Sequence, residues 1–285
     1  MKAIVTYFPK QLHNPKVAQL VGDNIATKPC PWKSDLSNQC QQVLAENGGF
    51  DIRITFDFSP KQYRKYSHFR LRPKHIIYET DAVFNRNLDS FEAAPIHHED
   101  DFGRYKIVDK VFVHQIKPKF DRVWALEQFE FYFVEKEILK TMLQRFSGFY
   151  EIPVVHHKTN EVIEAWGAFM SDSWLPSFDT NKTTEIISMD FGKQSLRSMG
   201  LQAADPEDLQ GLFDICRTPS ATHCGDSGYI ISRNVWEFWV NMGIKSFHLE
   251  PVLSVGSQEY DDYLTLWQQV QDVISLNPGN NIRTY

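Results

Sequence analysis

The sequence predicts an α+β protein, with a mixed sheet and flanking helices, that divides into an N-terminal region and a C-terminal α+β domain. Short apolar stretches of strand length indicate β-strands, and apolar residues spaced three or four apart indicate amphipathic helices between them. No apolar run approaches 18 residues, so the sequence predicts no membrane span. Glycine and proline together make up 28 of the 285 residues, an ordinary share that excludes collagen-like and low-complexity classes.

The start of the chain predicts two strands and a helix. Residues 3–8 have strand character, and residues 50–58 alternate between apolar and polar side chains. Residues 37–46 are predicted as a short helix, which ends at the glycine pair Gly48 and Gly49. This part of the chain therefore predicts a half-buried sheet.

The next elements follow a clearer pattern. Residues 129–134 are apolar enough for a strand, and the apolar positions up to Phe146 then follow helical spacing. Ser147 and Gly148 end that helix. Residues 151–155 and 162–169 are predicted as the two strands of a hairpin, and residues 185–191 as a further strand.

Capping residues define the last helices. Asp205 and Pro206 predict a helix start, with aspartate at the cap and proline at the first helical position. Residues 212–216 either continue that helix or form a strand. Ser232 predicts the cap of another helix that ends at Gly243. The remaining expected elements are strands at residues 228–231 and 246–252 and a final helix at residues 260–274.

Charge differs between the two halves of the chain. Residues 1–120 hold 18 Lys and Arg against 13 Asp and Glu, a balance of +5, whereas residues 121–285 have a balance of −11. Together these give the net charge of −6. With Pro118 between two lysines at the junction, the sequence predicts a basic region, 1–120, and an acidic domain, 121–285.

The compartment is predicted from the cysteines and the first residues. Four cysteines in 285 residues fit a reducing environment. The segment before Pro9 is too short for the apolar part of a signal peptide. We therefore expect a cytoplasmic protein that has no membrane contact.

Two patterns that resemble catalytic or metal sites have simpler interpretations. The string GDSG at residues 225–228 occurs in trypsin-like serine proteases, but there the histidine comes from a distant part of the chain, whereas His223 lies four residues before Ser227. We interpret the string as a turn before a strand. The cysteines, Cys30, Cys40, Cys216 and Cys224, include no Cys-x-x-Cys pair, so the sequence predicts ordinary thiols and leaves metal binding open.

One acidic and histidine-rich run is an alternative catalytic site. It consists of His97, His98, Glu99, Asp100 and Asp101. These side chains suit acid–base chemistry or a hard metal ion, so a hydrolase or transferase using them is an alternative function. The other interpretation is a solvated loop. No Gly-x-Gly-x-x-Gly or phosphate-binding loop is present, and we expect no cofactor.

A basic and aromatic stretch is the second alternative. It runs from Arg53 to His75, includes Arg70 and Arg72, and has tyrosines and a phenylalanine interleaved. Basic side chains release counterions from phosphates, and aromatic rings stack on unpaired bases. A nucleic-acid binder is therefore an alternative function, but the acidity of the whole chain argues against nucleic acid as a partner.

Residues 125–253 resemble the C-terminal domain of bacterial immunity proteins that are paired with polymorphic toxins. The strings that carry the resemblance are FVEKEIL at 133–139, YEIPV at 150–154, LFDICR at 212–217, GYIIS at 228–232 and GIKSFHLEPV at 243–252. One subgroup of that family carries a double Cys-x-x-Cys-Gly motif, which this chain lacks.

The resemblance implies a function. It implies a non-enzymatic cytoplasmic protein that binds and occludes a cognate toxin domain delivered by contact or by type VI secretion. The candidate contact residues are Asp172, Trp174, Trp236 and Trp239, although the two helical tryptophans also fit a core position. The sequence leaves the oligomeric state open.

Overall fold

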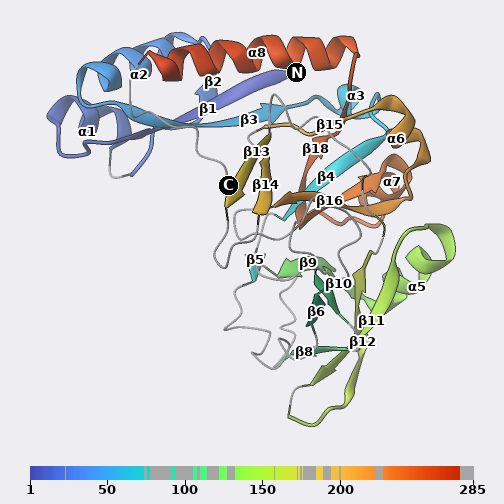
Figure 1. Ribbon diagram of the computed structural model, residues 1–285. Helices are drawn as coiled ribbons and strands as arrows, with labels where there is room; N and C mark the ends of the chain where they lie inside the picture. Colours follow the sequence, from blue (N-terminus) through green and yellow to red (C-terminus); the bar gives the residue numbers. More distant parts are fainter. Residues whose placement is uncertain are drawn as a thin grey trace.

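The protein has a mixed α+β fold, as the sequence predicts. The structure is a computed structural model that describes residues 1–22, 24–73, 76–77, 91–93, 105–107, 110–113, 122–126, 132–156, 158–171, 173, 175, 184–188, 194–198, 200–221 and 227–276. Figure 1 shows three principal sheets arranged along the molecule, with helices beside them. No helix among the described residues has both the length and the apolarity to cross a bilayer.

The first sheet contains strands from the start of the chain. β1 (Lys2–Pro9) lies between β2 (Cys30–Pro31) and β3 (Phe50–Asp57), and both pairings are antiparallel. Helices α1 (Pro15–Val21) and α2 (Asp35–Glu46) connect these strands. The predicted strands and the predicted helix of this region are confirmed. The helix begins earlier than expected because the Oγ of Ser34 accepts the backbone N–H of Ser37.

The second sheet joins strands from distant parts of the chain. Its order is β13 (Thr184–Ser188), β14 (Gln194–Ser198), β16 (Ile215–Ala221), β17 (Ser227–Ser232), β4 (His68–Pro73) and β18 (Phe247–Pro251). The strand β4 is antiparallel to both of its neighbours. A strand from the N-terminal region therefore lies inside the sheet of the predicted C-terminal domain.

The third sheet contains the predicted hairpin. Its order is β5 (Ile76–Ile77), β9 (Val123–Leu126), β10 (Tyr132–Glu135), β12 (Val162–Met170), β11 (Tyr150–His156) and β8 (Val111–Val113). Two short ladders complete the described strands, pairing β6 (Phe91–Ala93) with β7 (Tyr105–Ile107) and β15 (Ala203–Ala204) with β19 (Leu253–Ser254).

The other described helices are α3 (Pro60–Tyr63), α5 (Lys136–Arg145), α6 (Pro206–Gly211), α7 (Arg233–Asn241) and α8 (Gln258–Ser275). Ser232 caps α7 as predicted, by accepting the backbone N–H of Val235. Asp205 is the N-cap of α6, but its side chain makes no capping hydrogen bond. The open question at residues 212–216 is resolved, because α6 ends at Gly211 and β16 begins at Ile215.

The second and third sheets each contain strands from before and after residue 120. The predicted boundary at that position therefore does not coincide with a division between these sheets. Helix α8 also joins two cores. Its Tyr263 and Trp267 lie in the large core with Phe69 of β4, while its Val270 lies in a smaller core with Val5 of β1. Figure 1 shows α8 running along the first sheet and α2.

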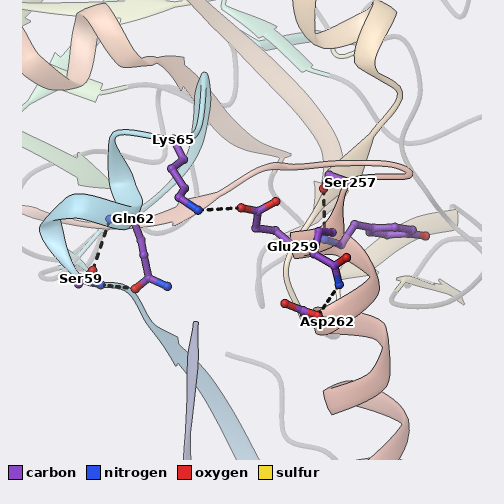
Figure 2. A network of polar contacts seen from close by, with 8 residues as sticks. Ser59, Gln62, Lys65, Ser257, Glu259 and Asp262 are labelled. Carbon is purple, nitrogen blue, oxygen red and sulfur yellow. Dashed lines mark hydrogen bonds and ion pairs between the residues drawn. The ribbon is translucent and has the colours of Figure 1, made fainter.

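A surface network fixes the start of α8 against α3. The Nζ of Lys65, in the turn after α3, lies 3.2 Å from the Oε1 of Glu259 in the first turn of α8. Figure 2 shows this contact between the two segments. Ser59 and Gln62 form a capping box at the start of α3, and Ser257 caps α8.

Candidate functional site

The predicted contact residues have different environments. Trp239 on α7 is 3% exposed, and its indole Nε1 lies 3.5 Å from the Sδ of Met142 on α5. It is a core residue with almost no surface to offer a partner. Trp236 is half-buried, and its ring centroid lies 5.8 Å from that of Tyr63 and 5.3 Å from that of Phe69. Part of the Trp236 ring therefore remains at the surface.

The remaining candidates fall outside the described residues. They are Asp172, Trp174, the run from position 97 to position 101, Cys224, and the first two residues of the GDSG string together with His223. Those predictions stay predictions.

The basic stretch does not form a continuous surface. Arg70 lies in the second sheet and is 3% exposed, so it does not face solvent where a phosphate could approach. Tyr66 and Phe69 are buried in the large core and have no free face for stacking on a base. Among the described basic side chains of the stretch, Lys61, Arg64 and Lys65 are exposed and Arg53 is half-buried. Neither Tyr66 nor Phe69 therefore offers the stacking platform that single-stranded nucleic acid requires.

A polar junction joins the end of α5 to the second sheet, and no pattern in the sequence indicates that its members meet. Asp214, just before β16, accepts a hydrogen bond from the Oγ of Ser232 at 2.7 Å. Its other oxygen accepts the backbone N–H and the hydroxyl of Ser147, both at 3.1 Å. His68 pairs with Ser232 across β4 and β17, and its Nδ1 lies 3.0 Å from the Oγ of Ser67. Serine, histidine and aspartate are therefore close together here.

Burial determines the protonation state at this junction. Desolvation lowers the pKa of His68 to about 4, and the positive charge of Arg233 acts in the same direction. Asp214 has the opposite but smaller effect. The imidazole is thus neutral at pH 7 and is a weak base.

The connectivity of the junction differs from that of a catalytic triad. In a triad the aspartate orients the histidine and the histidine activates the serine. Here the Asp214 carboxylate accepts directly from Ser232 and Ser147, and the Ser232 hydroxyl also accepts from the N–H of Val235. Each group has a structural role, because these bonds hold the end of α5, the start of β16 and the start of α7 together.

The cysteines are dispersed among the cores. Cys30 and Cys40 lie in the small core and Cys216 lies in a third cluster with Ile230, and all three are free thiols. Burial raises the pKa of Cys40 to about 11, with a smaller contribution from Cys30. Among the described residues, no group of three or more His, Cys, Asp or Glu side chains could hold a metal ion.

The acidic character of the C-terminal region is expressed at its surface. Within the described residues from 122 to 276, several lysines and arginines are already paired, as in Arg122 with Glu135 and Lys136 with Glu151. Other carboxylates there are exposed and form no ion pair. These are Glu161, Glu164, Asp205, Glu207, Glu237, Asp261, Asp262 and Asp272.

These carboxylates come from the β11–β12 hairpin, α6, α7 and α8, so the negative surface spans several elements. A surface of this kind attracts positively charged molecules over roughly one Debye length, about 8 Å at physiological salt.

No family model matches this chain, and no curated protein matches it either.

Proposed function

We propose that this protein is a non-enzymatic, toxin-neutralising immunity protein of the cytoplasm, which binds and occludes a cognate bacterial toxin domain. The observation that carries the proposal is the set of exposed, unpaired carboxylates in the described residues from 122 to 276. Carboxylates that are not used within the fold remain available to a partner. They would complement a basic toxin surface such as one that binds nucleic acid.

Electrostatics favours binding over catalysis as the role of this surface. A net negative surface raises the rate of encounter with an oppositely charged protein by about ten- to a thousandfold, and salt reduces that gain. The Ser–His–Asp junction is less suited to chemistry, because its aspartate is bonded to serine hydroxyls and its histidine is a weak base. The same acidic surface repels nucleic acid.

Co-expression with the product of the neighbouring gene tests the proposal. The neighbour alone should stop growth, and co-expression of this chain should restore it, with the two proteins purifying together. The association rate should fall by about tenfold or more between 50 and 500 mM salt, because screening removes the steering field.

A pair of variants sharpens this test. Glu161→Gln with Glu164→Gln should slow association, whereas Lys158→Gln on the same hairpin should leave it unchanged or speed it up. A neighbour that is harmless on its own and does not bind would refute the proposal.

A further inference from the structure

Arg145 is held in an unusual way at the end of α5. Its guanidinium carbon lies 5.5 Å from the ring centroid of Phe146 and 5.1 Å from that of Phe238 on α7. The two rings themselves meet edge to face, with centroids 5.5 Å apart. Two cation–π contacts therefore fix an exposed guanidinium across the seam between α5 and α7.

This cation has no acidic partner, although it lies in the acidic part of the chain. On the same helix, Lys136 pairs with Glu151 and Lys140 pairs with Glu137. The guanidinium of Arg145 forms no ion pair or side-chain hydrogen bond with any described residue. Asp214, on the neighbouring segment, is engaged by Ser147 and Ser232 instead. The donor groups of Arg145 thus remain available.

An exposed aromatic residue packs against the turn that follows α5. Phe213 is 51% exposed, and its Cβ approaches Gly148 so closely that any side chain at position 148 would overlap it. Gly148 also has a φ of +90°, a conformation that favours glycine. The chain therefore uses a glycine to bring Phe213 against the turn that follows Phe146.

We infer that Arg145, Phe146 and Phe213 form a docking point that binds a carboxylate of the toxin flanked by an apolar side chain. The inference rests on the proposed function and names the contact that the toxin would make. A guanidinium presents a planar fork of donors that matches a carboxylate, and the rings hold that fork in place before binding. Phe213 supplies the apolar area that shields the pair from water.

Charge complementarity identifies the occupant. The acidic surface attracts a partner that is basic overall, but such a surface does not determine the orientation in which the partner binds. Arg145 is an exposed cation that is ion-paired with no described residue, and it selects the orientation in which an acidic side chain of the partner meets it. Long-range attraction and local recognition are then provided by different residues.

The test is the affinity for the purified product of the neighbouring gene, measured by calorimetry with full-length variants. Arg145→Gln and Phe213→Ala should each weaken binding by about 30-fold or more, as expected for hot-spot residues. Arg145→Lys should recover only part of the loss, because lysine keeps the charge and loses the planar fork. Melting temperatures of all variants are measured alongside to confirm that the fold is retained.

Two matched controls separate docking from general surface effects. Lys140→Gln removes a cation from the same helix, and Val240→Ala shortens an apolar side chain that is 54% exposed on α7. Both should change affinity by less than about threefold, since fewer than a third of interface residues matter strongly. If wild type binds and the Arg145 and Phe213 variants bind equally well, the docking point is wrong and the proposed function stands. If wild type does not bind, both are rejected.

Discussion

The two main hydrophobic cores of this protein differ in composition and in how the chain builds them. The large core is rich in aromatic side chains, such as Phe69, Trp239 and Trp267, and collects elements from both sides of residue 120. The small core is mostly aliphatic around Val5 and Leu44, apart from Tyr7, Phe50 and two thiols. Both nevertheless include residues of α8. The charge asymmetry along the sequence therefore describes surfaces and does not mark the limits of the cores.

The largest expected effect comes from breaking the helix that the two cores share. Trp267→Ala removes a buried indole from α8 and should lower the free energy of unfolding by about 3–5 kcal/mol. Leu44→Ala in the small core should cost about 2–5 kcal/mol. Urea unfolding should show one transition for each variant, because α8 couples the cores.

The exposed Leu276, just after α8, provides the control. Leu276→Ala should change stability by less than about 0.5 kcal/mol. A separate early transition for Leu44→Ala would show that the small core unfolds independently.

The second-largest expected effect is that of acid, which should lower the free energy of unfolding through His68 and not through the shifted groups of the small core. The folded pKa of His68, about 4, lies below its ordinary value of about 6.5, so protonation favours the unfolded chain. The stabilisation is complete above pH 6.5 and is lost as the pH falls towards 4, with a total of about 3 kcal/mol. In the small core the shifted groups are Tyr7, Cys30 and Cys40, whose pKa values are raised and which do not titrate in acid.

The pH effect is measured by urea unfolding at pH 7, 5.5 and 4.5, with His68→Asn for comparison. The free energy of unfolding of the variant should depend less steeply on pH, because the contribution of His68 is missing. An equal pH dependence in wild type and variant would assign the effect to other groups.

The smallest effect belongs to the surface pair that fixes the start of α8. Lys65→Ala removes the contact to Glu259 shown in Figure 2, in which the two side chains are 64% and 38% exposed. The loss should be below about 1 kcal/mol and should disappear in 1 M salt, because exposed ion pairs are weak and screened. A larger loss that persists in salt would indicate that Lys65 contributes through packing.

Local signals in the sequence predicted much of the fold. Ser232 and Pro206 mark helix starts that the structure confirms, because a cap depends on residues within one turn. The position of β4 could not be predicted, since it pairs with strands about 160 residues further along the chain and a local pattern does not encode the partner.

The polar junction and the docking surface were missed for the same reason. His68, Asp214 and Ser147 are unremarkable in isolation and meet only when β4, β16 and the end of α5 come together. Arg145 and Phe213 likewise come from separate segments. The sequence feature that points to the docking surface is a basic residue, Arg145, next to a phenylalanine within an acidic segment.

The shared helix also has a consequence for the order of events on the ribosome. Val5 is synthesised long before Val270, but the small core in which Val5 is buried needs both residues. At translation rates of about 5–20 residues per second, β1 and β3 wait on the order of tens of seconds for α8. During that interval the inner face of the first sheet is incompletely covered, so the nascent chain is a natural client for chaperones that bind exposed apolar strands.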